Sequence, residues 1–177
     1  MSNIIFLDVD GVLNSKFWDN EHQREISEGK YVDIEKVSLL GSLVKRTGAK
    51  IILHSGWRFW FDKSMKPLRP EAAFFADTMK SEGIRIAGVT PDLTTEEIRK
   101  TKKFSMVKAD EILLWLEENS YDNWVVLDDL ELNNIEIGKH QVKTDAEVGL
   151  TVMDVERAVT ILAGRQKLID SSRKTYS

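Results

Sequence analysis

The sequence contains no cysteine, and this absence removes several kinds of chemistry at once. A chain without thiols has no disulfide framework, no thiolate metal site and no cysteine nucleophile. Histidine is also scarce: the three present, His22, His54 and His140, are scattered along the chain. A zinc site built from clustered histidines is therefore not predicted, and His54 is interpreted as a packing residue at a strand end. The lack of cysteine is compatible with a reducing cytoplasm, which is the expected location.

Long apolar runs are missing as well. No run approaches the length needed to cross a bilayer, and no basic region with a long apolar segment precedes the first strand. We therefore expect neither a membrane span nor a secretion signal. The net charge of -4 argues against a general nucleic-acid coat protein, although it leaves room for a local basic patch. Repeats and linkers are absent too, so we predict one domain over residues 1–165 and a polar tail at 166–177.

Short apolar segments alternate with segments of helical periodicity. We predict strands at Ile4–Leu7, Lys50–Leu53, Ile84–Val89, Trp124–Leu127 and, with a weaker pattern, Gln141–Lys143. We predict helices at Asp33–Thr47 with Asp33 as the N-cap, at Pro70–Lys80, from Ser105 onward, and at Val152–Ala163. A strand, helix, strand unit makes a right-handed crossover between parallel strands. The sequence therefore predicts an α/β fold with a mainly parallel five-stranded sheet and helices on both faces.

Two polar segments of the chain lack a regular pattern. Residues 15–30 are irregular, and residues 92–104 contain only the hint of a short capped turn at Thr94 with Glu97. The second segment and the start of the next helix contain a basic cluster: Arg99, Lys100, Lys102, Lys103 and Lys108.

Two aspartates follow the first predicted strand, with one residue between them. Asp8 and Asp10 would share a face of the extended chain, at the end of a parallel strand where open α/β sheets bind ligands. One carboxylate can attack an electrophile or hold a cation while the other moves a proton. The structural alternative is an Asp-Gly turn that only ends the strand, and this segment alone does not decide between the two.

A second acidic pair, Asp128 and Asp129, follows the fourth predicted strand and should lie at the same edge of the sheet. Crowded carboxylates repel one another and any phosphate, and a cation relieves that repulsion. Mg²⁺ takes one or two carboxylates, several waters and a phosphate oxygen, so that Asp8 with Asp128 or Asp129 supplies a suitable set. Which member of the pair binds the metal directly is left open, and the other would bond a lysine.

Candidate phosphate ligands follow the second predicted strand and begin the helix after the third. Ser55 offers a hydroxyl, Gly56 a backbone N–H, and Arg58 and Lys108 offer cations that can bind phosphate oxygens. Thr144 and Asp145 follow the fifth strand and are expected to contact the residues of this site without contacting the substrate themselves.

Three of these assignments have alternatives. A serine at a strand end also caps helices, so Ser55 can be structural. Lys102 or Lys103 can replace Lys108 as the phosphate lysine, since all three belong to the same cluster. Arg58 can instead form a surface ion pair.

In this order along the chain, the segment Asp8–Leu13, Ser55, a lysine near 108 and the Asp128-Asp129 pair resemble the four motifs of the haloacid dehalogenase-like (HAD) phosphohydrolases. Further segments resemble, more narrowly, a small HAD subgroup associated with RNA repair proteins. These are Ser-Gly-Trp-Arg at 55–58, Gly-Val-Thr-Pro at 88–91, Glu111-Ile112 with Trp115-Leu116, and Thr144-Asp145 with Gly149-Leu150-Thr151.

The resemblance implies a Rossmann-like HAD core and a magnesium-dependent phosphomonoester hydrolase. Asp8 would be the nucleophile that forms an aspartyl-phosphate, and Asp10 the general acid and base. The metal ligands would come from Asp8, Asp10, Asp128 and Asp129, with Mg²⁺ as the cofactor. A phosphotransferase with the same intermediate and a silent phosphate-binding or regulatory module are the alternatives.

The chain leaves little room for a cap domain. Only 44 residues separate Asp10 from Ser55, and 52 separate Ser55 from Lys108, and both gaps must also supply core elements. The site should therefore be open unless a second subunit covers it, and no oligomeric state is predicted. An open site suits a phosphorylated substrate that is large, such as a nucleic-acid end, better than a small metabolite. The basic cluster and the aromatic residues at 57–61 would then form the walls. The alternative is that Trp57, Phe59, Trp60 and Phe61 belong partly to the core, whereas an exposed ring would be able to stack on a base or a sugar.

Overall fold

The computed structural model describes residues 1–15 and 32–164. The predicted irregular segment therefore lies outside the described residues except for Ser15, as does the polar tail at 166–177. Within the described ranges, no helix combines the length and the apolar composition that a membrane span requires.

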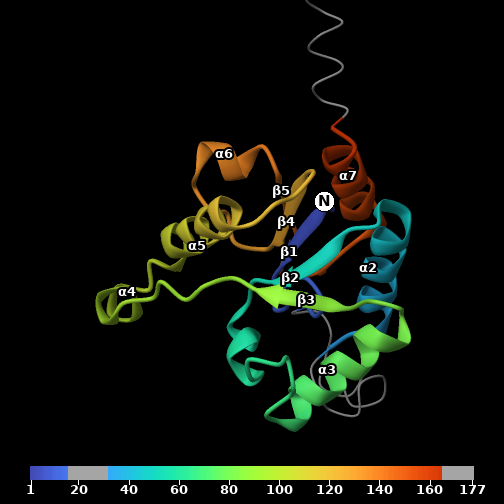
Figure 1. Cartoon of the computed structure of the whole chain (residues 1–177), viewed down its shortest axis with the longest axis horizontal. Coiled ribbons are helices and arrows are strands. Elements are labelled where there is room, and N and C mark those ends of the chain that lie inside the picture. The colour runs from blue at the N-terminus through green and yellow to red at the C-terminus, as the bar shows by residue number, and fades with distance from the viewer. Residues whose placement is uncertain (16–31, 165–177) are drawn as a thin grey trace, which may run out of the picture.

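In residues 1–15 and 32–164, five strands form a single sheet in which every pairing between them is parallel (Figure 1). Their spatial order is β3 (Ile86–Val89), β2 (Lys50–Leu53), β1 (Ile4–Leu7), β4 (Trp124–Asp128) and β5 (Gln141–Lys143). The predicted α/β fold with a parallel five-stranded sheet is thus confirmed. Because β1 lies between β2 and β4, the carboxyl ends of these three strands are neighbours.

Helices cover both faces of the sheet, as predicted (Figure 1). One face carries α2 (Ile34–Thr47), α3 (Pro70–Ser81) and α7 (Val152–Leu162), and the other carries α5 (Phe104–Glu118) and the short α6 (Ile135–Gly138). Alternate residues of β1 serve the two cores: Ile5 and Leu7 belong to the first, and Ile4 and Phe6 to the second. Four consecutive apolar residues are needed because this strand is buried on both sides.

The ends of α2 follow directly from local sequence. The Asp33 carboxylate accepts a hydrogen bond from the Glu35 N–H at 2.9 Å, which confirms Asp33 as the N-cap. Gly48 adopts a left-handed conformation with φ of 65° and donates its N–H to the Val44 carbonyl at 2.8 Å.

The third strand is shorter than predicted. It begins at Ile86 rather than Ile84, because the Ile84 N–H donates to the Met79 carbonyl at the end of α3, at 2.9 Å. Ile84 is buried all the same, so that its apolar character marked the core and not the strand.

The hydrophobic periodicity of the sequence did not predict two short helices. The polar segment after β3 contains α4 (Glu96–Thr101), and its N-cap is Thr95, which accepts a hydrogen bond from the Ile98 N–H at 3.3 Å. The predicted cap at Thr94 is therefore wrong by one residue. The four residues of α6 bury only Ile137, which is too little for a helical pattern.

Between β2 and α5 the chain forms η1 (Gly56–Trp60), α3, β3 and a short helix, α4, and most of these elements pack in the core. Ala72, Phe75 and Met79 of α3 are fully or almost fully buried in the first core. Helix α4 buries no residue of its own and contacts α5.

Candidate active site

The predicted site residues meet at the carboxyl end of the three central strands. A pocket of about 450 Å³ opens there, and all of these residues except Asp128 line it: Asp8, Asp10, Ser55, Gly56, Arg58, Lys108 and Asp129. Asp128 is fully buried behind the pocket wall. Parallel topology explains the convergence, because strand ends that are distant in sequence share one edge of the sheet.

Three carboxylates form a compact acidic group in this pocket. Asp8, Asp128 and Asp129 each place an oxygen atom within 4.8 Å of the others. Burial and the nearby Asp128 charge raise the pKa of Asp8 well above its usual range. Three carboxylates this close repel one another when all are ionised, and their oxygen atoms are the ligands that a divalent cation such as Mg²⁺ prefers. The group therefore fits such a cation. The side chain of Asp10 is not part of this group.

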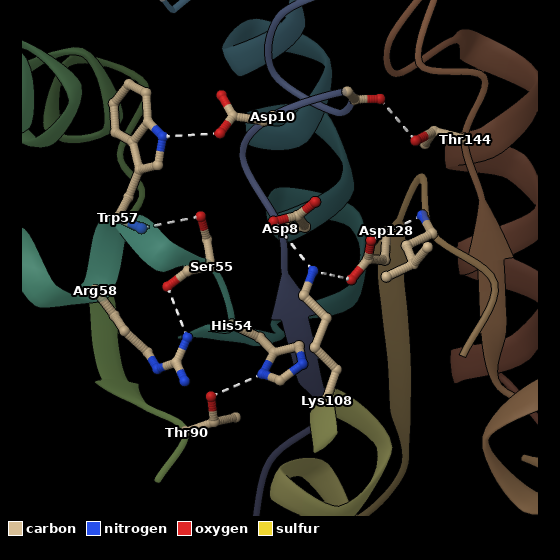
Figure 2. A network of polar contacts seen from close by, with 12 residues as sticks. Asp8, Asp10, His54, Ser55, Trp57, Arg58, Thr90, Lys108, Asp128 and Thr144 are labelled. Carbon is tan, nitrogen blue, oxygen red and sulfur yellow. Dashed lines mark hydrogen bonds and ion pairs between the residues drawn. The ribbon is translucent and has the colours of Figure 1, made fainter. Parts of the chain in front are cut away.

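Lys108 anchors the group from α5 (Figure 2). Its Nζ lies 2.7 Å from Asp128 Oδ2 and 3.5 Å from Asp8 Oδ1. Burial lowers the pKa of Lys108, but the Asp8 and Asp128 charges outweigh it, so that the pKa is raised and the ammonium persists. Lys102 and Lys103 are exposed at the ends of α4 and α5 and do not line the pocket, which places Lys108 alone of the three at the acids.

The two consecutive aspartates have different surroundings. Both Asp128 oxygens are bonded within the protein, Oδ2 to Lys108 and Oδ1 to the Leu130 N–H at 2.9 Å. Asp129 lines the pocket. Geometry therefore favours Asp129 as the direct metal ligand and Asp128 as the partner of the lysine.

Gly11 makes the approach of Asp129 possible. The glycine has φ of +79°, and a Cβ at this position would lie 2.5 Å from Asp129 Cγ. Any side chain there would displace the carboxylate. The turn is also held from β5, because the buried Thr144 hydroxyl donates to the Gly11 carbonyl at 2.7 Å. Thr144 thus supports the site from behind, as expected.

Asp10 lines the pocket from the side opposite the lysine (Figure 2). Its Oδ2 accepts a hydrogen bond from the Trp57 indole N–H at 3.3 Å, and its Oδ1 accepts one from the Asn14 amide at 3.0 Å. These contacts orient a carboxylate that is otherwise exposed. Trp57 was assigned to the core, and it is 4% exposed, but its indole N–H also serves the site.

The turn after β2 is a short 3-10 helix, η1 (Gly56–Trp60), and Ser55 is its N-cap. Ser55 Oγ accepts a hydrogen bond from the Trp57 N–H at 3.2 Å, so that the capping alternative holds. The same residue lines the pocket with Gly56. A capping role and a phosphate-binding role are therefore compatible.

Arg58 forms an ion pair, but the pair is buried and not on the surface as the alternative supposed. Its Nη2 lies 2.8 Å from Glu111 Oε2, and its Nη1 donates to the Ser55 carbonyl at 2.9 Å. Glu111 Oε2 also accepts the Leu93 N–H at 3.0 Å. The pair therefore joins η1, α5 and the segment after β3 around one side of the pocket. The Arg58 Nε is buried without a hydrogen-bond partner in the part of the chain that the structure describes.

His54 lies under the site and is fully buried (Figure 2). Its Nδ1 is 2.7 Å from the Thr90 hydroxyl, and its Nε2 has no hydrogen-bond partner among the described residues. Burial, helped by the Lys108 and Arg58 charges, lowers the pKa of His54 well below its usual range. The ring is therefore neutral, in keeping with its interpretation as a packing residue.

Sequence reasoning missed Glu111 as a site residue. Its partner Arg58 lies 53 positions earlier in the chain, and no local pattern marks a glutamate on the buried side of a helix. The only available signal was its place in the motif Glu111-Ile112.

Comparison with known families agrees with this geometry. A family model described as the HAD domain in Swiss Army Knife RNA repair proteins matches residues 4–155. The matched range contains every residue of the site. No curated protein and no solved structure shows a significant match to the chain. HAD domains imply chemistry of the phosphohydrolase type, and the acidic pocket at the ends of β1 and β4 suits it. The match covers most of the chain, and the protein belongs to the family of HAD domains found in Swiss Army Knife RNA repair proteins.

Proposed function

We propose that the protein is a magnesium-dependent phosphomonoester hydrolase that acts through an aspartyl-phosphate on Asp8. The carrying observation is the placement of the Asp8 carboxylate in the pocket, with Lys108 Nζ 3.5 Å from its Oδ1 and Asp129 beside it. A carboxylate that attacks a phosphate must approach another anion, and a cationic neighbour is what makes that approach feasible.

The reaction would proceed in two displacements. An oxygen of Asp8 attacks phosphorus, the bond to the leaving oxygen breaks, and Asp10 gives that oxygen its proton. Asp10 then takes a proton from water, and the resulting hydroxide attacks phosphorus. The bond between phosphorus and the Asp8 oxygen breaks, so that inorganic phosphate leaves and the Asp8 carboxylate is regenerated. The bonds from Trp57 and Asn14 would keep Asp10 directed at the leaving group and the water.

The chain's cations and acids divide the remaining work. Asp8 and Asp129 would hold Mg²⁺, which supplies positive charge to the transferring phosphoryl oxygens. Lys108 adds a second positive charge, and Asp128 holds its ammonium in place. Ser55 and the Gly56 backbone would bind further phosphate oxygens.

A nucleic-acid end phosphate is the substrate class that the surroundings support best. Helix α4, its C-cap Lys102 and the N-cap of α5, Lys103, expose basic side chains just before Phe104, which lines the pocket; the helix itself contributes Arg99 and Lys100. The family description refers to RNA repair proteins, in agreement with such a substrate. A polynucleotide backbone would contact these cations while its terminal phosphate reached Asp8.

A turnover assay with a chromogenic phosphomonoester tests the chemistry. We expect magnesium-dependent release of inorganic phosphate and a labelled aspartyl-phosphate after rapid quenching. Transfer of phosphate to an added alcohol at the expense of water would identify a phosphotransferase. Absence of turnover on a panel of nucleotides, sugar phosphates, phosphopeptides and oligonucleotides would identify a binding module and overturn the proposal.

A paired measurement tests the substrate class. We expect kcat/KM to be higher for an oligonucleotide than for the mononucleotide with the same terminal phosphate. Reversal of charge at Lys102 and Lys103 should reduce only the oligonucleotide advantage, and the reduction should vanish at high salt. A clear preference for the mononucleotide at moderate salt would reject a nucleic-acid end.

A further inference from the structure

The pocket that contains the acids also exposes two phenylalanine rings. Phe59 of η1 and Phe104, the first residue of α5, line the same pocket as Asp8 and Asp129. Phe59 is 55% exposed and Phe104 is 40% exposed. An aromatic ring in water forgoes the burial that normally stabilises it. Two such rings beside reactive acids therefore indicate a surface that a ligand covers.

The exposed ring of Phe59 is held in place from behind. The Arg58 guanidinium carbon lies 4.5 Å from the centroid of the Phe59 ring, in a cation–π contact. Arg58 is itself fixed by the Ser55 carbonyl and by Glu111, and its side chain is only 6% exposed. A ring that is oriented before binding loses little freedom when a ligand arrives, which favours affinity.

The charges around the pocket divide it into two chemical environments. Asp8, Asp129 and Lys108 provide the charged groups that a phosphate and its cation require. Around Phe59 the positive charge of Arg58 is balanced by Glu111 at 2.8 Å. An uncharged planar group suits that second environment. The volume of about 450 Å³ accommodates more than a phosphate, since small-ligand sites span roughly 300–1,000 Å³.

We propose that Phe59 and Phe104 form a stacking subsite for the base of the nucleotide that carries the scissile phosphate. The inference rests on the proposed function, because the base belongs to the leaving group of the same reaction. Stacking uses the face that every base offers, so the subsite accepts any terminal base. A sugar phosphate offers the two rings no aromatic face.

A double-mutant cycle between protein and substrate tests the subsite. The protein change is Phe59→Leu, and the substrate change is removal of the terminal base from an oligonucleotide that keeps its end phosphate. On the intact substrate we expect Phe59→Leu to lower kcat/KM about tenfold, mainly through KM. On the abasic substrate the loss should be much smaller, because the partner of the ring is gone. Phe104→Leu should give the same pattern, and Phe59→Trp should restore activity on the intact substrate.

A control variant and defined rejecting outcomes make the cycle decisive. Ile135→Ala changes a side chain on α6 that is 87% exposed and does not line the pocket, and it should leave the ratio between the two substrates unchanged. Equal losses on the intact and abasic substrates would reject base stacking. So would an unaffected kcat/KM, or a loss explained by disruption of a dimer in sedimentation experiments.

A binding measurement separates failure of the subsite from failure of the proposed chemistry. Asp8→Asn is titrated with a nucleoside monophosphate and with inorganic phosphate, in the presence of Mg²⁺. The subsite is supported if the nucleotide binds more tightly than inorganic phosphate and if adding Phe59→Leu to this variant removes the difference in affinity. This holds even if the wild-type protein shows no turnover. Equal affinity for the two ligands overturns the subsite even if the protein proves to be a phosphatase.

Discussion

Two ion pairs flank the pocket, and helix α5 contributes one partner to each. Lys108 reaches Asp128 of β4 at 2.7 Å, and Glu111, one turn later, reaches Arg58 of η1 at 2.8 Å. Residues three apart lie on the same side of a helix, so that α5 joins two strand ends with one surface. The charge contributed by the helix is opposite in the two pairs.

The surroundings of the two pairs decide what each can do. The Lys108 ammonium faces three carboxylates, so negative charge remains after the pair has formed. The Arg58–Glu111 pair is balanced and also satisfies a backbone N–H. The first pair therefore belongs to an acidic group that fits a divalent cation, and the second stabilises the wall of the pocket. Both ion pairs lie at the pocket, so their position does not distinguish them. They differ in the number of charged side chains around each pair.

Substitution of Asp8, the proposed nucleophile, should produce the largest effect, and it removes one of the carboxylates that surround the Lys108 ammonium. Asp8→Asn should lower kcat on the order of a thousandfold or more, because an amide is a poor nucleophile. The melting temperature without metal should rise, since one of three crowded carboxylates is gone. Asp110→Asn, an exposed change on the same helix as Lys108, is the control for charge alone. Substantial hydrolysis by Asp8→Asn would contradict the mechanism.

Metal removal should sharpen the distinction between Asp128 and Asp129. Chelation should abolish activity, and added Mg²⁺ should restore it and raise the melting temperature. Asp129→Asn should weaken Mg²⁺ binding about tenfold or more, whereas Asp128→Asn should mainly lower kcat through a misplaced Lys108. Titration of the melting temperature with Mg²⁺ measures both. Full activity in excess chelator, or the reverse order of the two variants, would refute the assignment.

Loss of one member of the balanced pair should cost stability. Glu111→Gln should lower the free energy of unfolding by about 3–5 kcal/mol, because it leaves the Arg58 charge buried without a counter-charge. Replacing both residues, with Arg58→Met and Glu111→Leu together, should cost less than Glu111→Gln alone. Urea denaturation measures these values. Glu156→Gln breaks the exposed pair with Arg46 and should change stability little, as a matched control.

The pH dependence of stability should reveal the neutral histidine between the two pairs. The pKa of His54 is lowered in the folded protein, so the unfolded chain binds a proton that the folded chain refuses. The stability contribution of His54 is therefore constant above the ordinary histidine pKa of 6.5 and is lost as the pH falls below it, by at most about 1.4 kcal/mol per pH unit.

The difference between wild type and His54→Gln isolates this contribution. The carboxyl groups of Asp8, Asp128 and Glu111 have raised pKa values and act in the opposite direction in both proteins. Denaturation at several pH values should show a less steep acid loss in His54→Gln. Equal slopes in the two proteins would show that His54 is protonated in the folded state.

Local patterns predicted much of the fold and the polar residues that follow β1, β2 and β4 at the site. The apolar run of β1, the cap at Asp33 and the glycine after α2 are short-range signals, and the structure confirms the elements that they predicted. The convergence of Asp8, Ser55 and Asp129 also followed from sequence, because parallel strands bring their carboxyl ends to one edge.

Long-range partners were out of reach of such patterns. Arg58 and Glu111 are 53 positions apart, and the burial of their ion pair depends on how α5 lies over η1. The start of β3 depends on a hydrogen bond from the Ile84 N–H to the Met79 carbonyl near the end of α3, which takes the place of a strand pairing. An alternating strand pattern in the sequence does not reveal such a bond.

The sequence by itself determined the order of elements, the parallel sheet and the acids at its edge, since these depend on side-chain periodicity and on strand ends. Tertiary structure alone decided which of those residues bond one another and which face the pocket. Asp128 is bonded to Lys108 while Asp129 lines the pocket, and Phe59 and Phe104 share that pocket with them. The physical reason is that charge balance and solvent exposure are set by neighbours from distant segments, which only the packed chain brings together.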